Sequence, residues 1–271
     1  MSFIVISILF FITGLFTGIL AGMLGIGGGL IFVPILYLLL PFTPIDKAQI
    51  SYIAIGTSLF SAAITSISSG ANHYLAKNVE KRKALFLAIG SVISSVIASF
   101  LVIKVEPFYL KLIFGLVFVI ISVKMFSERN SKNKKQIKDT IILHEYFAIF
   151  FGFLIGIFAA FTGLGGGILF VPVLTFLFGV NIKKAIGTSS LVISITGVAA
   201  ASAYATHIPK GSIAPFQFGY IYFVAGLPLS IGAAIGAIKG VKIVLGSSSE
   251  KIKKIFSILL VLIVVKILLG I

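Results

Sequence analysis

The chain has 271 residues, of which 59% are hydrophobic and only 11% are charged. A soluble domain carries about 25% charged residues, so this composition indicates a polytopic membrane protein. The net charge of +15 does not indicate nucleic-acid binding, because most basic residues lie in loops between apolar segments and no soluble basic face is available. With no cysteine in the chain, disulfides, thiolate metal sites and cysteine nucleophiles are excluded.

Ten apolar segments follow one another along the chain. They lie at about 3–24, 28–41, 48–70, 84–103, 107–125, 144–162, 166–179, 185–206, 214–238 and 255–270. The first has the length of a secretory signal peptide, but it lacks a basic n-region and it matches residues 140–162 later in the chain. We therefore expect it to remain in the mature protein.

A polar stretch divides the ten segments into two sets of five. It runs from Ser127 to Thr140 and contains Glu128, Arg129, Lys132, Lys134, Lys135, Lys138 and Asp139. We expect a first membrane repeat at residues 1–126, a basic cytoplasmic linker at 127–142 and a second membrane repeat at 143–271.

Two sequence motifs occur once in each half. The turn Gly25-Ile26-Gly27-Gly28-Gly29 returns 138 residues later as Gly163-Leu164-Gly165-Gly166-Gly167, and a similar apolar run follows each turn. The stretch Ala54–Ser58 returns 131 residues later as Ala185–Ser189, so the connecting loop is shorter in the second half. Internal repeats of this size are a recurring signature of secondary transporters.

The distribution of Lys and Arg distinguishes two topologies. If all five segments of each half change side, the halves are inverted, and 17 of the 22 basic residues fall on one face. If only four segments per half change side, the halves are parallel and the split is 12 to 10. Because basic residues concentrate on the cytoplasmic side, the sequence predicts inverted halves in the cell membrane, with both termini outside and the linker in the cytoplasm.

The predicted fold is an all-α polytopic membrane protein of two inverted five-segment repeats, each with a glycine-turn hairpin of short or re-entrant helices. Segments 28–41 and 166–179 hold about 14 residues, whereas a spanning helix needs about 20. Each therefore either re-enters the membrane as a half-helix or spans it at some cost. Both glycine turns would then approach the bilayer midplane, related by a pseudo-two-fold axis.

The chemistry expected at these turns is anion binding. Each turn precedes a new helix, whose first amides lack partners and carry partial positive charge, and glycines leave those donors uncovered. Hydroxyls at equivalent places in the two halves complete an oxyanion shell, unless they bond to carbonyls of their own helices. The predicted substrate-binding residues are Gly25, Gly27, Gly28, Gly29, Thr57, Ser58, Gly163, Gly165, Gly166, Gly167, Thr188, Ser189 and Ser190.

Other motifs argue for packing rather than catalysis. The turns are not dinucleotide fingerprints, because Leu30 and Ile168 stand where a third glycine is required, and no ATP-binding phosphate loop is present. No acid cluster or nucleophile–base pair emerges, so we expect no enzyme activity, no metal and no cofactor. Two small-residue faces predict close helix packing. They are Gly14/Gly18/Gly22 and Gly232/Gly236/Gly240.

Three polar residues are candidates for a gate or a proton relay. His73 and His207 follow the third segments of their halves at nearly matching places, and Asn72 lies beside His73. An interfacial histidine without such a role is the more common situation.

The doubled motifs resemble those of the TauE/SafE family of membrane permeases, named for sulfite and sulfonate export. The resemblance rests on G-x-G-G-G-x-x-x-V-P at Gly25–Pro34 and Gly163–Pro172 and on A-x-G-T-S at Ala54–Ser58 and Ala185–Ser189, and it covers nearly the whole chain. It implies transport of sulfur-containing or small organic anions, such as sulfite, sulfoacetate or taurine-related sulfonates, and about eight membrane crossings.

Together these patterns predict a secondary transporter for a small anion, working by alternating access at a midplane site between the two glycine turns. Its partners would be that anion and the lipid bilayer. Two alternatives stay open: an anion channel that uses the same turns as a filter, and a membrane scaffold that transports nothing. Substrate identity, transport direction, coupling ion and oligomeric state do not follow from the sequence.

Overall fold

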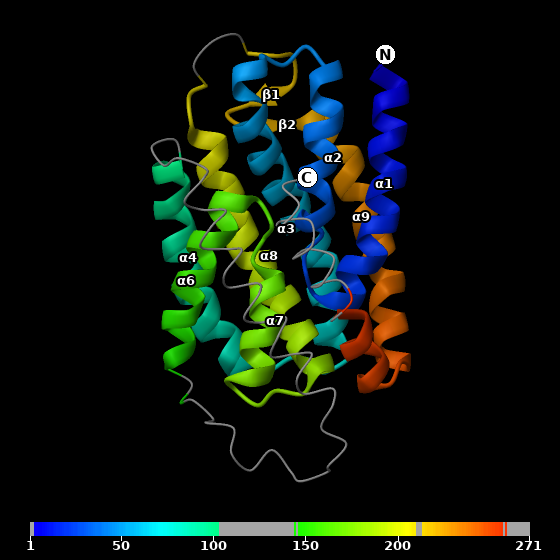
Figure 1. The fold of residues 1–271 in the computed structure, drawn as a ribbon, viewed down its shortest axis with the longest axis vertical. Helices are drawn as coiled ribbons and strands as arrows, with labels where there is room; N and C mark the ends of the chain where they lie inside the picture. The colour runs from blue at the N-terminus through cyan, green and yellow to red at the C-terminus, as the bar shows by residue number, and fades with distance from the viewer. Residues whose placement is uncertain (1–2, 103–143, 145, 210–212, 257, 259–271) are drawn as a thin grey trace.

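The computed structural model describes residues 3–102, 144, 146–209, 213–256 and 258, and Figure 1 shows a helical fold. The α-helices are α1 (Phe3–Leu24), α2 (Gly29–Leu39), α3 (Ile50–Leu75), α4 (Lys81–Leu101), α6 (Phe147–Thr162), α7 (Gly167–Phe176), α8 (Ile182–Thr206) and α9 (Phe223–Gly246). Two 3-10 turns, η1 (Leu40–Phe42) and η2 (Lys47–Gln49), precede α3. The expected linker at 127–142, the segment expected at 107–125 and most of that at 255–270 lie outside the described residues.

Five of these helices are long and apolar enough to cross a membrane, namely α1, α3, α4, α8 and α9. Their outward faces carry large apolar side chains: Phe16 is 65% exposed on α1, Leu85 59% on α4 and Ile231 52% on α9. A water-soluble domain would bury such a surface, whereas lipid tails solvate it. The predicted all-α polytopic membrane fold is confirmed.

The two short segments that follow the glycine turns are short helices. The helix α2 has 11 residues and α7 has 10. At 1.5 Å per residue each is about 15–17 Å long, roughly half the thickness of a bilayer's hydrocarbon core. Each contains one proline, Pro34 or Pro172, at the sixth residue of its helix.

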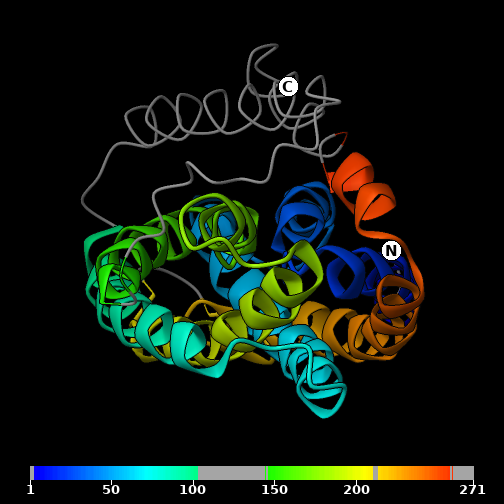
Figure 2. The same cartoon turned by 90° about the horizontal axis from the view of Figure 1, so that it is seen from below.

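Six of the described helices form three packed pairs. α1 packs along α9, α6 packs along α4, and α3 packs along α8 between these two pairs, as Figure 2 shows from below. The first helix of each half thus packs on the fourth helix of the other half, and the third helices meet each other. The central pair also touches both flanking pairs, since α3 packs on α9 and α8 on α4.

Glycines hold the flanking pairs close together. A methyl group placed on Gly14, Gly18 or Gly22 of α1 would collide with the backbone of α9. The same substitution at Gly232, Gly236 or Gly240 of α9 would collide with the backbone of α1. The prediction that these two small-residue faces pack helices is confirmed.

Contacts between loops show which helix ends lie together. At one end, the Asn78 amide donates to the Lys183 carbonyl oxygen, and the Lys183 ammonium donates to the Leu245 carbonyl oxygen. At the other end, Gln217 donates to Gln49, and His207 Nε2 lies 2.9 Å from the Ser99 carbonyl oxygen. α3 and α9 therefore run in one direction, and α4 and α8 run in the opposite direction.

The helix α9 differs most from its predicted boundaries, since it both begins and ends later in the chain. We expected a helix at 214–238, but α9 begins at Phe223. The residues before it form a small antiparallel hairpin of β1 (Gln217–Phe218) and β2 (Ile221–Tyr222). The left-handed backbone at Phe216 (φ 61°) and Gly219 (φ 54°) is incompatible with a continuous helix.

Candidate functional site

The two glycine turns, which the sequence predicted to lie close together, touch each other. A methyl group placed on Gly29 would lie 2.5 Å from the Gly163 carbonyl oxygen, and one on Gly167 would lie 2.5 Å from the Gly25 carbonyl oxygen. These reciprocal contacts involve equivalent atoms of the two halves. Only glycine permits such close backbone approach, and all four residues are buried.

The turns also share one backbone conformation. Gly25, Gly27 and Gly28 have φ angles of 66°, 74° and 89°, and their counterparts Gly163, Gly165 and Gly166 have angles of 72°, 72° and 77°. This left-handed region is costly for other residues. The glycines therefore set the path of the chain as well as the spacing between the turns.

Each turn leaves a set of backbone amides without acceptors. Gly28 and Gly166 are the N-caps of α2 and α7, and their carbonyls accept the first bonds of each helix. Among the described residues, none accepts a hydrogen bond from the amides of residues 27–30 or 165–168. Two buried helix N-termini thus meet with open donors and partial positive charge, which favours a negatively charged ligand.

Serine hydroxyls fasten each turn to the central helix of the other half. Ser58 on α3 donates to the Gly163 carbonyl oxygen, and Ser189 on α8 donates to the Gly25 carbonyl oxygen, both at 2.7 Å. All four groups are buried. Each serine thereby satisfies a carbonyl oxygen that faces the opposite turn, and the turn amides are the groups left for a ligand.

The neighbouring threonines cap helices. Thr57 Oγ1 accepts from the Tyr222 amide at the start of α9, and Thr188 Oγ1 accepts from the Glu80 amide at the start of α4. The remaining hydroxyl of the predicted set, that of Ser190, accepts a 3.1 Å hydrogen bond from Ser69. In this structure these hydroxyls therefore have protein partners, and their direct contact with a ligand stays a prediction.

Sequence reasoning missed Ser66, whose hydroxyl is one of two buried hydroxyls without a hydrogen-bond partner in the described part of the chain, the other being that of Tyr222. The Ser66 side chain is only 1% exposed, and Ser66 Oγ has no hydrogen-bond partner in the described structure. It lies 3.2 Å from the position that a methyl group on Gly27 would take, directly beside the first turn. The sequence did contain a signal for it: Ser58, Ala62 and Ser66 are spaced four residues apart, so Ser66 lies on the same face of the helix as the predicted Ser58.

The histidines lie elsewhere. His73 Nε2 is 3.4 Å from the Gly22 carbonyl oxygen, and His73 Nδ1 is 3.0 Å from the Asn78 amide nitrogen, which also donates to a carbonyl. These partners fit a neutral ring protonated on Nε2. Asn72 donates to the Ser68 carbonyl oxygen one turn earlier.

The contacts identify Tyr204 as the residue that is equivalent in position to His73, with His207 three residues further along. The residue 131 positions after His73 is Tyr204, and its hydroxyl donates to the Ala160 carbonyl oxygen, the counterpart of Gly22. His207 lies beyond it at the end of α8, where its ring packs against Phe100, Tyr204 and Tyr220.

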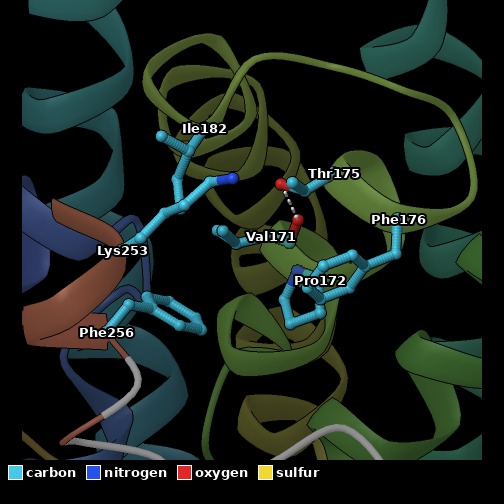
Figure 3. A pocket seen from close by; sticks show the side chains of 7 residues that line it. All are labelled: Val171, Pro172, Thr175, Phe176, Ile182, Lys253 and Phe256. Carbon is cyan, nitrogen blue, oxygen red and sulfur yellow. Dashed lines mark hydrogen bonds between the residues drawn. The ribbon is translucent and has the colours of Figure 1, made fainter. Parts of the chain in front are cut away.

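A separate pocket lies between α7, the start of α8 and the helical segment that carries Lys253 and Phe256 (Figure 3). Its cavity of about 20 Å³ holds about one water molecule. The only hydroxyl in its lining, that of Thr175, donates to the Val171 carbonyl oxygen. The lining residues are Val171, Pro172, Thr175, Phe176, Ile182, Lys253 and Phe256. This pocket is too small and too apolar to hold a hydrated anion.

Comparison with known proteins gives one consistent result. A family model described as sulfite exporter TauE/SafE matches residues 10–267. The chain is 29% identical over 265 residues to a probable membrane transporter protein of Haemophilus influenzae, with 97% of each chain covered. It is 29% identical over 243 residues to the probable membrane transporter protein MJ0441 of Methanocaldococcus jannaschii, with 89% of this chain and 88% of that one covered.

A third relative is the probable membrane transporter protein YunE of Bacillus subtilis, which is 27% identical over 277 residues, with 97% of this chain and 96% of that one covered. No solved structure matches the chain.

Proposed function

This chain belongs to the sulfite exporter TauE/SafE family of membrane transporters, and we propose that it is a secondary transporter that moves a small anion between its two glycine turns. The first candidates are sulfite and small organosulfonates. The observation that carries the proposal is the pair of buried helix N-termini, in mutual contact, whose amides have no protein acceptor among the described residues.

The electrostatics of the site favour a compact oxyanion. The two helix N-termini each contribute about half a positive charge, and no lysine or arginine side chain is needed to hold the ligand. The unpartnered Ser66 hydroxyl beside Gly27 adds a donor. A site built from fixed dipoles binds an anion without a buried full charge, which allows the anion to leave again.

We further propose that the two halves are inverted repeats related by a pseudo-two-fold axis. Three pairs of equivalent contacts support this: turn against turn, Ser58 and Ser189 on opposite turns, and His73 and Tyr204 on the carbonyls of Gly22 and Ala160. Under this symmetry, the movement that opens one end is equivalent to the movement that opens the other. Alternating access then follows from rocking one half against the other, and the touching turns correspond to an occluded state.

The proposed orientation puts the end that contains Asn78, Lys183 and Leu245 in the cytoplasm. Basic residues gather there: Lys77, Lys81, Arg82, Lys83, Lys183, Lys184, Lys239 and Lys242. Only Lys47 lies at the opposite end among the basic residues of the described helices and their loops. This asymmetry follows the positive-inside bias.

The decisive experiment uses Ser66→Ala. Because the Ser66 hydroxyl has no partner among the described residues, its removal should break no hydrogen bond and relieve a buried polar group, so stability should stay the same or rise by up to about 1–3 kcal/mol. Binding of the anion should weaken about 10- to 100-fold, since a hydrogen bond to a charged group is worth about 1.5–3 kcal/mol.

The measurement is a thermal-shift titration of the purified protein with sulfite, sulfate, thiosulfate, sulfonates and small carboxylates, followed by flux of the best ligand in proteoliposomes. Ser51→Ala, an exposed serine on the same helix, is the matched control. If Ser66→Ala binds and transports as the wild type does, the site between the turns is wrong. If no anion stabilises the wild type, the scaffold alternative is favoured, and currents without counterflow exchange would favour a channel.

A further inference from the structure

One apolar side chain lies against both glycine turns at once. Ile193, in the middle of α8, is completely buried. Its Cγ2 atom lies 3.0 Å from the position that a methyl group on Gly27 would take and 3.2 Å from the equivalent position at Gly165. Its Cδ1 atom lies 2.7 Å from the equivalent position at Gly167.

The symmetric position in the first half is small. The residue 131 positions before Ile193 is Ala62, whose Cβ lies 3.7 Å from the same position at Gly165. Both residues therefore border the same space, one from each central helix. Two isoleucines would compete for this space, so one half fills it and the other half leaves room.

Ile193 also borders the unpartnered hydroxyl. A methyl group on Gly27 would meet Ile193 Cγ2 at 3.0 Å and Ser66 Oγ at 3.2 Å. The buried amides, the open hydroxyl and this apolar side chain thus share one small region. A side chain there limits the volume left for a ligand and separates the donors from water.

We propose that Ile193 is the plug of the transport path: its side chain closes the passage between the two glycine turns and sets how large an anion passes. This inference rests on the proposed function, because it concerns the same site. The plug moves with α8, so it withdraws when the two halves rock apart. The Ile193 Cγ2 and Cδ1 atoms border Gly27, Gly165 and Gly167, so these two atoms limit the size of an anion that passes between the turns.

The test uses the natural absence of cysteine from this chain. Ser66→Cys places one thiol beside the plug. The rate at which this thiol reacts with the anionic reagent 2-sulfonatoethyl methanethiosulfonate is measured in the single variant and in three double variants, each with one further substitution. Ile193→Ala should raise the rate at least about tenfold, and Ile193→Val, which lacks only the Cδ1 methyl, should give an intermediate rate, since one methylene in a pocket discriminates about 10- to 200-fold. Ile195→Ala, which removes a half-exposed isoleucine of the same helix, should leave the rate unchanged.

Equal labelling rates of Ser66→Cys with and without the Ile193→Ala substitution would overturn the plug, provided that both proteins elute as single species from size-exclusion chromatography. If Ile193→Ala does not fold, the Ile193→Val rate decides in the same way. In proteoliposomes, Ile193→Ala should also raise the flux of benzenesulfonate relative to sulfite, and an unchanged ratio would contradict the size limit.

Failure of the proposed function has a different signature. If the wild type transports no sulfur oxyanion but labelling still depends on residue 193, the plug stands and the substrate assignment fails. If the cationic trimethylammonium analogue of the reagent labels Ser66→Cys as fast as the anionic one, the preference of the site for anions fails, while the dependence on Ile193 still tests the plug.

Discussion

At the scale of single residues, the site depends on which hydroxyls have partners. Ser58 and Ser189 each donate a hydrogen bond to a turn carbonyl, whereas Ser66 is buried and has no partner in the part of the chain that the structure describes. The first two therefore stabilise the folded turns, and the third is free for a ligand. The same residue type thus serves two roles, and the local hydrogen-bond geometry decides which one.

This difference predicts opposite effects on stability. Ser58→Ala and Ser189→Ala should each destabilise the protein by about 1–3 kcal/mol, because each leaves a buried carbonyl oxygen without its donor. Because the two hydrogen bonds are equivalent in the two halves, the two variants should lose similar amounts of stability. Chemical denaturation in detergent, with Ser51→Ala as the control, measures them. A loss in one variant and none in the other would contradict equivalent roles for the two halves.

At the scale of helices, backbone contact between α1 and α9 sets the spacing of the flanking groups. A methyl group on Gly18 would collide with the Ala233 carbonyl oxygen and lie 2.6 Å from Ala233 Cα, and backbone atoms cannot move aside as a flexible side chain does. Gly246, at the end of α9, has nothing within 4 Å of such a methyl group.

The two positions give a matched pair of substitutions. Gly18→Ala should destabilise the protein by about 1–3 kcal/mol through overpacking. Gly246→Ala should be neutral or stabilise it by up to about 1 kcal/mol, because alanine favours helix more than glycine does. Melting temperatures of the two variants in detergent check the prediction. Equal effects at both sites would mean that close helix packing at α1 and α9 does not limit stability.

At the scale of the whole molecule, the two ends are closed by different chemistry. At one end, Lys184 on α8 forms a 2.7 Å ion pair with Glu80, just before α4, and so joins the two halves. At the other end, the contacts of Gln217 with Gln49 and of His207 with Ser99 join the halves, together with aromatic rings such as those of Tyr52 and Tyr220, whose centroids lie 5.2 Å apart. An ion pair responds to pH and salt, whereas packed aromatic rings do not.

The Glu80–Lys184 pair predicts a small effect of acid. Its hydrogen bond to Lys184 lowers the pKa of the Glu80 carboxyl, so the stabilisation is complete above the ordinary glutamate pKa and is lost as the pH falls through the lowered value. Since both groups are about a third or more exposed, the loss should stay below about 1 kcal/mol. Denaturation of the wild type and of Glu80→Gln across acidic pH measures it, and a larger pH dependence in Glu80→Gln than in the wild type would contradict the assignment.

The sequence by itself determined the membrane class, the two-fold repetition of motifs, the short helices after the glycine turns and the small-residue faces between helices. These features follow from local composition, spacing and backbone preference, which a linear pattern records. The repeated Gly-Thr-Ser also pointed to the parts of α3 and α8 whose serines donate hydrogen bonds to the glycine turns.

Only the tertiary structure decided which groups meet. It brought the two turns together through backbone contacts, gave the hydroxyls of Ser58 and Ser189 to carbonyls of the opposite half, and left Ser66 without a partner. It also gave His73 and Tyr204 equivalent carbonyl partners and placed Ile193 and Ala62 beside the same glycine, Gly165. A hydrogen-bond partner from the other half of the chain depends on which helices pack together and in which register, and the order of residues along one helix does not specify that partner.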